Sequence, residues 1–197
     1  MQTENLIPEN VKRIGVMVSG GIDSALLLYL MSKENKEKGS PIELTAFTIH
    51  RHDGAEHFSN QIISTVEKML DVTIPKIAVG QPTAHSNKQV QTGIFEATLK
   101  HKAERVYLAS TAVPEHLNIP NFAPNRDPNN YKSVFQPWVL ILKDQVIKYI
   151  VDNNLDILAK ASHSCTSQSY GRCNKCFNCL EREWAFKINN ASDCGID

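Results

Sequence analysis

The chain has 197 residues, of which 42% are hydrophobic and 21% charged, and its 21 basic residues balance its 21 acidic residues. This composition is typical of a globular protein with a substantial core, and the zero net charge argues against a general nucleic-acid-binding surface. No apolar run is long enough to cross a membrane, and the first residues lack the basic and apolar regions of a signal peptide. We therefore expect a cytoplasmic protein in a reducing setting, without membrane or nucleic-acid partners.

Apolar patterning predicts strands and helices that alternate along the chain. Strands are expected at 13–18, 44–49, 72–79 and 105–109, and helices from 25 onward and at 56–70, 88–102 and 143–153. The segment 114–130 is rich in Pro and Asn and predicts a long loop, of the kind that is usually functional or mobile. The alternation favours an α/β fold, a parallel sheet with helices on both faces that binds ligands beyond the carboxyl ends of its strands. We treat residues 1–197 as a single domain.

The most informative stretch lies between the first expected strand and helix, and reads Ser19-Gly20-Gly21-Ile22-Asp23-Ser24. Glycines let the backbone approach phosphate oxygens, the helix N-terminus attracts anions, and the two serines add hydroxyl donors. A carboxylate beside phosphate needs a cation between them, so we interpret Asp23 as a partner of magnesium or of an ammonium-type group. The alternative is a plain tight turn in which Asp23 caps the helix.

This string resembles the pyrophosphate-binding loop of the ATP pyrophosphatase superfamily, and it matches neither the Walker nor the dinucleotide-binding pattern. Enzymes of that superfamily activate a carboxyl or carbonyl oxygen with ATP, usually by adenylation, before a nucleophile replaces it. The resemblance implies an adenine nucleotide alpha hydrolase-like, Rossmann-like fold. It also implies ATP and Mg²⁺ as cofactors, with the nucleotide bound by residues 19–24.

Four of the five cysteines predict a metal site, namely Cys165, Cys173, Cys176 and Cys179. Two overlapping Cys-x-x-Cys steps can wrap one tetrahedral ion, and Cys165 closes the shell from across a loop. We interpret the segment 163–188 as a structural zinc knuckle followed by a helix starting at Leu180. An iron–sulfur cluster and redox-active or disulfide-bonded thiols are the alternatives. His163 is expected to be a neighbour of the metal, and Cys194 to be free.

Loop and knuckle together resemble the 7-cyano-7-deazaguanine synthase family, the ATP- and ammonia-dependent enzymes of the queuosine pathway. The residues that carry this resemblance outside the loop are Arg51, His52, Glu56, Pro137, Lys143, Ser164, the four cysteines, Arg182 and Phe186. The resemblance implies conversion of 7-carboxy-7-deazaguanine to the nitrile through an amide. It also implies small-molecule partners, the deazaguanine carboxylate and ammonia, and a tendency to form dimers.

On this resemblance Gly20, Gly21 and Ser24 bind phosphate, and Asp23 organises the cation. Lys143 stabilises charge on the phosphates, or is a surface lysine at a helix start. Arg51 holds a phosphate or carboxylate, or forms a salt bridge within its loop.

His52 shuttles a proton, or is a simple hydrogen-bonding residue. Glu56 is expected mainly to begin its helix, and Arg126 and Asp127 are weaker candidates for a site. Trp138 and Trp184 are expected in the core.

The sequence departs from that family where the acceptor would bind. The segment from Thr83 to Lys88 lacks the glycine and arginine of the family motif, and residues 110–116 replace an acidic and aromatic loop. These departures leave three alternatives: transfer to another carboxylate, a non-catalytic nucleotide-binding protein, or tRNA sulfur transfer. The last needs a reactive cysteine outside the knuckle, and Cys194 alone is available.

Overall fold

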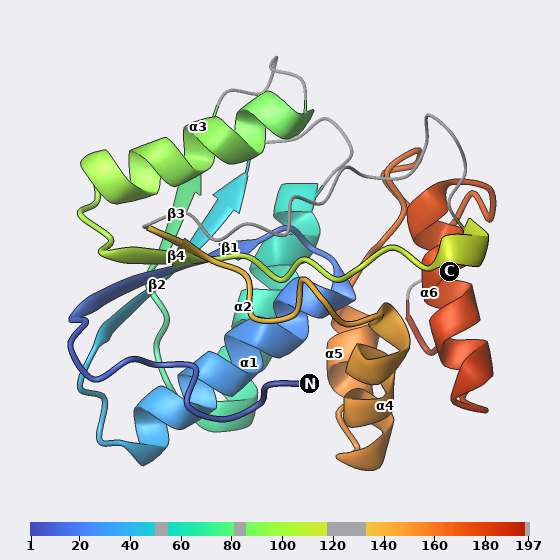
Figure 1. Cartoon of the computed structure of the whole chain (residues 1–197), viewed down its shortest axis with the longest axis horizontal. Helices are drawn as coiled ribbons and strands as arrows, with labels where there is room; N and C mark the ends of the chain where they lie inside the picture. Colours follow the sequence, from blue (N-terminus) through green and yellow to red (C-terminus); the bar gives the residue numbers. More distant parts are fainter. Residues whose placement is uncertain (50–54, 81–85, 118–132, 196–197) are drawn as a thin grey trace.

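The protein is described by a computed structural model that covers residues 1–49, 55–80, 86–117 and 133–195. Within these ranges five parallel strands form one sheet in the order β3-β2-β1-β4-β5 (Figure 1). The strands are β1 (Arg13–Val18), β2 (Glu43–Ile49), β3 (Lys76–Val79), β4 (Arg105–Tyr107) and β5 (Val134–Phe135). The expected α/β fold with a parallel sheet is confirmed.

Helices cover both faces of the sheet. They are α1 (Ile22–Glu37), α2 (Ala55–Leu70), α3 (Ser86–Leu99), α4 (Lys143–Asp152), α5 (Asp156–Ala161) and α6 (Phe177–Ile188), with a short 3₁₀ helix η1 (Glu115–Leu117). Figure 1 shows α3 on one face and α1 and α2 on the other, with α4, α5 and α6 grouped at one side. None of the helices in these ranges has the length and apolar character needed to cross a bilayer.

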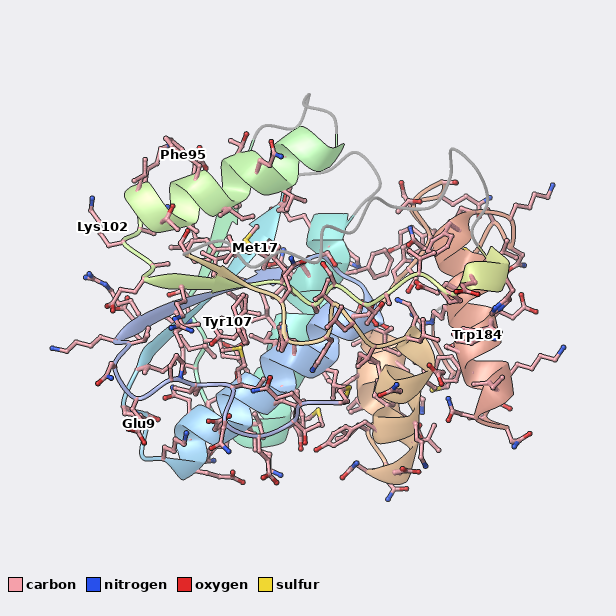
Figure 2. The ribbon with its side chains drawn as sticks, viewed as in Figure 1. Glu9, Met17, Phe95, Lys102, Tyr107 and Trp184 are labelled. Carbon is pink, nitrogen blue, oxygen red and sulfur yellow. The ribbon has the colours of Figure 1, made fainter. Side chains whose placement is uncertain are left out.

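The side chains of β1 alternate between two apolar cores because successive residues of a strand point to opposite faces. Val16 and Val18 belong to the larger core, which α1 and α2 close, whereas Met17 belongs to the smaller core beneath α3. Figure 2 shows Met17 on the α3 side of the sheet and Tyr107 on the α1 side. The Tyr107 hydroxyl donates a hydrogen bond to the carbonyl oxygen of Leu6 at 2.6 Å, which ties the N-terminal segment to the larger core.

Two element boundaries differ from the prediction for reasons visible in the backbone. The third strand begins at Lys76 rather than 72, because Pro75 has no N–H to donate, although its carbonyl accepts from Ala46 N–H at 2.8 Å. Helix α3 ends at Leu99 rather than 102. The chain turns directly after it, where the amides of His101 and Ala103 donate to the carbonyls of Glu96 and Ala97, and Lys102 has a left-handed φ of 58°.

Four further elements were shorter, longer or absent in the prediction. The fourth strand ends at Tyr107, and its neighbour β5 has only two residues, too few for a periodic pattern. The six-residue helix α5 was not predicted. Helix α6 begins at Phe177, three positions before the expected start at Leu180.

The two tryptophans lie in or against the larger core. Trp138 is completely buried, which confirms its predicted place, and its indole N–H donates to the carbonyl of Gln2 at 2.8 Å. Trp184 is half-buried on α6, packs against the same core and lies 5.1 Å from the ring of His116.

Candidate functional site

The glycine loop joins the end of β1 to the start of α1 at the carboxyl end of the sheet. Along the chain, strands β2 and β3 are added on one side of β1, and strands β4 and β5 are then added on its other side. The loop after β1 therefore lies at a topological switch point, where sheets of this kind bind ligands. Gly20 has a φ of 85°, a conformation that other residues rarely adopt, and Gly21 is the N-cap of α1. The amides of the first turn of α1 have no acceptor within the helix and face the loop.

Both serines of the loop shape its backbone. The Ser24 hydroxyl donates to the carbonyl of Gly21 at 2.8 Å and accepts from the Ser19 amide at 3.2 Å. The two hydroxyl oxygens lie 3.3 Å apart. Their side chains therefore converge inside the turn, and the hydroxyl of Ser24 is already engaged within the loop.

Asp23 does not cap α1, so the capping alternative is wrong. The N-cap is Gly21, which makes no side-chain cap hydrogen bond. Asp23 instead lies in the first turn, where its Oδ2 forms a very short ion pair with the Nζ of Lys143. Its other oxygen, Oδ1, is buried and has no hydrogen-bond partner among the described residues.

Lys143 is the first residue of α4 and is 4% exposed, so the surface-lysine alternative is wrong. Besides Asp23, its ammonium group lies 3.2 Å from Oε2 of Glu181, a residue of α6 that is completely buried. One buried lysine therefore lies between two carboxylates. The three formal charges sum to one negative charge, which favours a further cation at the loop.

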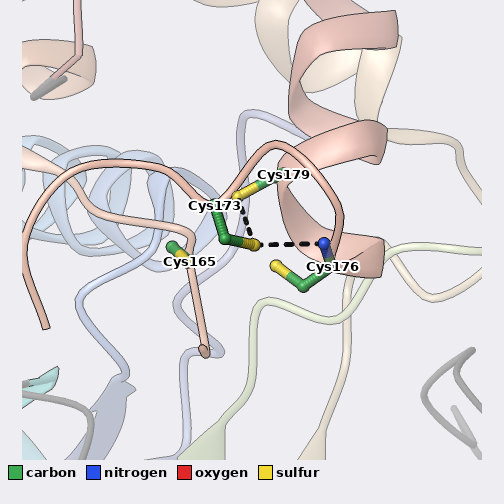
Figure 3. A group of neighbouring side chains, drawn as sticks. All are labelled: Cys165, Cys173, Cys176 and Cys179. Carbon is green, nitrogen blue, oxygen red and sulfur yellow. Dashed lines mark hydrogen bonds between the residues drawn. The ribbon is translucent and has the colours of Figure 1, made fainter. Parts of the chain in front are cut away.

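The four predicted cysteines converge, as Figure 3 shows. All four Sγ atoms lie within 4.8 Å of one another, and those of Cys173 and Cys179 are 3.9 Å apart. A tetrahedral zinc with Zn–S distances of about 2.3 Å holds its sulfurs roughly 3.8 Å apart, so the set fits a metal ion. All the cysteines of the chain are free, so a disulfide-bonded pair, one of the alternatives, is not formed.

Two thiols of this group differ in acidity. The amides of Lys175 and Cys176 donate toward Cys173 and lower the pKa of its thiol to about 6. Burial raises the pKa of the Cys179 thiol well above its usual range. These surroundings favour the thiolate form of Cys173 and the protonated form of Cys179 in the absence of a metal, and a thiol loses its proton when it binds a metal.

The segment before Cys165 contacts the glycine loop directly. The amide of His163 donates to the carbonyl of Gly20 at 2.8 Å, and the imidazole stacks on Phe58 with ring centroids 4.3 Å apart. The ring Nε2 lies 2.9 Å from the carbonyl of Gln168 within the cysteine loop. His163 therefore contacts the glycine loop, α2 and the cysteine loop at once.

Arg182 of α6 fixes the other side of this segment. Its Nε and Nη2 donate to the two oxygens of Asp193 at 2.8 and 2.9 Å. Nη1 donates to Ser162 Oγ at 2.9 Å and Ser164 Oγ at 3.2 Å, and Nη2 to the carbonyl of Ala159 at 3.0 Å. This fully buried guanidinium holds the segment 159–164 against α6 and the chain end.

Several predicted residues lie outside the described ranges, namely Arg51, His52, Arg126, Asp127 and the altered stretch from Thr83 to His85. Glu56 is described and lies in the first turn of α2, as its helix-starting interpretation requires. Cys194 is apart from the cysteine group, and its thiol lies 3.6 Å from the carbonyl of Asp156.

Sequence reasoning missed Glu181. It follows Cys179 by two positions in a charged run, Glu-Arg-Glu, in which nothing distinguishes the buried Glu181 from the exposed Glu183. The helical spacing of apolar residues around it was the one available signal, because it places Glu181 on the inner side of α6.

A glycine loop between a central parallel strand and a helix, at the switch point of the sheet, is the arrangement of a doubly wound nucleotide-binding α/β fold. The family model described as asparagine synthase matches residues 9–117, more than half of the chain. The chain belongs to the asparagine synthase family, a family of ATP-utilising enzymes. No curated protein matches the chain in sequence.

Solved structures share the fold at low sequence identity. The NMN synthetase of Francisella tularensis has 16% identity and a TM-score of 0.52, over 96% of this chain and 82% of that one. An FMN adenylyltransferase of Candida glabrata has 13% identity and a TM-score of 0.47, over 72% of this chain and 49% of that one. The U34-tRNA thiolase NcsA of Methanococcus maripaludis, solved with its [4Fe–4S] cluster, has 13% identity and a TM-score of 0.47, over 95% of this chain and 68% of that one. Of these three structures, the NMN synthetase alone has a TM-score above 0.5, and at 16% identity its similarity shows a shared fold and no more.

Proposed function

We propose that the chain is an ATP- and ammonia-dependent enzyme that converts 7-carboxy-7-deazaguanine to 7-cyano-7-deazaguanine through an amide. The observation that carries the ATP-dependent part is the buried Asp23–Lys143 pair beside the glycine loop, in a chain of the asparagine synthase family. The identity of the acceptor rests on the resemblance of the cysteine motif and the loop to the nitrile-forming family. We take residues 1–197 as one domain that includes the metal-binding segment 163–188.

The first half of the reaction requires a better leaving group than oxide. ATP activates one carboxylate oxygen, and ammonia then displaces the activated oxygen to give the amide. In the second half the amide oxygen is activated again and lost, which leaves the nitrile. The enzyme must therefore hold the nucleotide phosphates in a fixed orientation twice in each cycle.

We assign the residues of the loop to this task. Gly20, Gly21 and Ser24 bind phosphate oxygens, with Ile22 beside them and Ser19 at the rim. Asp23 holds Mg²⁺ through its unpaired Oδ1. Lys143 balances charge on the phosphates and on Asp23. Arg51 holds a phosphate or a carboxylate, and His52 shuttles a proton.

The cysteine group is proposed to hold structural Zn²⁺. Four protein ligands leave no open position for a substrate, so the metal would stabilise the fold around the loop and take no part in the reaction. Zinc fits the thiolate set without requiring assembly of a cluster. Measuring the metal content of the purified protein decides between zinc and iron.

A second candidate keeps the ATP chemistry and changes the acceptor to another carboxylate. The altered stretch from Thr83 to Lys88 favours it, because the glycine and arginine of the nitrile-forming family are absent there. A non-catalytic nucleotide-binding protein is the remaining alternative. All three candidates bind ATP. The deazaguanine carboxylate and ammonia are ligands of the first candidate, and a dimer is the form that the resemblance implies.

The decisive experiment incubates the purified protein with ATP, Mg²⁺, ammonium and 7-carboxy-7-deazaguanine and follows the mass of the deazaguanine. We expect the amide and then the nitrile, with loss of both products in Asp23→Asn. Glu37→Gln, an exposed change at the far end of α1, is the matched control and should retain activity. Unchanged acid in the presence of bound ATP would refute the deazaguanine assignment and favour another acceptor.

A further inference from the structure

Glu181 is a buried carboxylate for which the proposed reaction provides no role. It lies on α6 and is fully excluded from solvent, and its Oε2 lies 3.2 Å from the ammonium group of Lys143. A buried carboxylate is costly unless a cation and hydrogen bonds compensate it. Its burial beside Lys143 therefore points to a role at the lysine.

The geometry gives Lys143 two counterions with different surroundings. Asp23 is in the first turn of α1 and keeps Oδ1 unpaired beside the glycine loop, whereas Glu181 lies deeper, behind the lysine. A cation that binds Asp23 weakens the hold of that carboxylate on Lys143, because the two cations repel each other. Glu181 then keeps the ammonium group charged and in place.

Helix α6 also connects this lysine to the cysteine centre. Cys176 is the N-cap of α6, Cys179 lies in its first turn, and Glu181 follows two residues later. At the other end of α6, the Asn189 side chain donates to the carbonyl of Asp144 in α4 at 2.9 Å. The position of Glu181 relative to Lys143 is thus fixed from both ends of one short helix.

We propose that Glu181 is a positioning residue that acts through Lys143 on Asp23, so that the cysteine centre and the nucleotide loop are energetically coupled. This inference rests on the proposed function in one respect, the binding of Mg²⁺ and ATP at the glycine loop. Glu181 touches neither nucleotide nor metal. Its effect is the correct placement of the Lys143–Asp23 pair.

The test is a double-mutant cycle read out as affinity for a non-hydrolysable ATP analogue with Mg²⁺, measured by calorimetry on the metal-loaded protein. We expect Glu181→Gln to weaken binding about tenfold, within the range of couplings between contacting charged groups. In the Asp23→Asn background the same change should have no further effect. Glu183→Gln, an exposed change on the same helix, is the matched control and should bind as the unsubstituted protein does.

Two results would overturn the proposal: unaltered affinity in Glu181→Gln, or an equal loss in both backgrounds, which is the additive pattern of a general structural effect. Metal content and thermal unfolding are measured for every variant. If Glu181→Gln does not fold, Glu181→Asp, which keeps the charge on a shorter side chain, replaces it in the cycle. Failure of the unsubstituted protein to bind the nucleotide would refute the proposed function and this inference with it.

Discussion

The glycine loop and the cysteine centre are neighbours that are built by different forces. The loop sits on β1 and α1, whose residues fill the larger core, and helix α1 is buried over most of its length. Polar groups hold the cysteine segment: Arg182 with Asp193, the His163 amide with the Gly20 carbonyl, and four convergent thiols, of which those of Cys165 and Cys179 are buried. One region is held by apolar burial, and the other by directed interactions.

This difference determines how each region responds to change. Apolar burial is non-directional, so a core substitution reduces stability and leaves the geometry of the loop largely intact. Hydrogen-bonded charges depend on orientation, and the loss of one partner leaves the other buried and unpaired. The Asp23–Lys143–Glu181 group is the place where the two regions meet.

The largest effect on stability is expected when the Asp23–Lys143–Glu181 group, the polar junction of the two regions, loses its lysine. Lys143→Met keeps an unbranched side chain, one atom shorter, and removes its charge, which leaves the buried carboxylates of Asp23 and Glu181 together without their shared counterion. We expect a loss of about 3–5 kcal/mol in the free energy of unfolding, measured by chemical denaturation.

Lys148→Met is the matched control on the same helix. Lys148 pairs with Asp152 in an exposed position, so its replacement should change stability by about 0.5 kcal/mol or less. Equal losses for the two variants would show that the buried group contributes no more than a surface pair.

An intermediate effect is expected in the larger core. Leu27→Ala removes a completely buried side chain of α1 and should cost about 3 kcal/mol, from lost burial and the cavity left behind. Leu140→Ala, at a position 82% exposed, should change stability by less than about 0.5 kcal/mol. Denaturant melts of both variants test this, and retained nucleotide binding by folded Leu27→Ala would support the contrast between the regions.

A smaller loss in the free energy of unfolding, about 2 kcal/mol, is expected for Arg182→Lys. An ammonium group cannot reproduce the pair of parallel hydrogen bonds that the guanidinium donates to the carboxylate of Asp193. Burial raises the pKa of Asp193, but its hydrogen bonds and charge interactions with Arg182 outweigh this and hold the pKa below its ordinary value of 3.8. The stabilisation from this carboxylate is therefore complete above that value and lost as the pH falls through the lower pKa of the folded state. The free energies of unfolding of the unsubstituted protein and of Arg182→Lys, measured at several pH values, should differ less below about pH 4. A difference that does not depend on pH would contradict this account.

The sequence predicted the apolar region well, because burial leaves periodic patterns. The boundaries of β1 are as predicted, and those of α2 and α4 differ by one residue at one end. Elements without a period were missed, such as the two-residue β5 and the short α5. The spacing of the cysteines predicted their convergence, since Cys-x-x-Cys steps constrain local geometry.

The polar junction could not be predicted in the same way. Asp23 and Lys143 were each singled out, but their pairing joins residues 120 positions apart, and no local pattern encodes it. Glu181 stands two residues from a second glutamate of the same helix; helical spacing places it on the inner side of α6, but its pairing with Lys143 of α4 is not encoded there. Partners of this kind follow from the tertiary arrangement of the helices.

The hydrogen bond from the His163 amide to the Gly20 carbonyl has a consequence for how freely the C-terminal part can be exchanged. A chain cut before α5 would keep every strand of the described sheet, yet it would lose the donor that holds a backbone oxygen of the glycine loop. The cysteine segment therefore stabilises the backbone of the glycine loop. Grafting it between relatives, or deleting it in a minimised enzyme, requires a new donor for that one carbonyl.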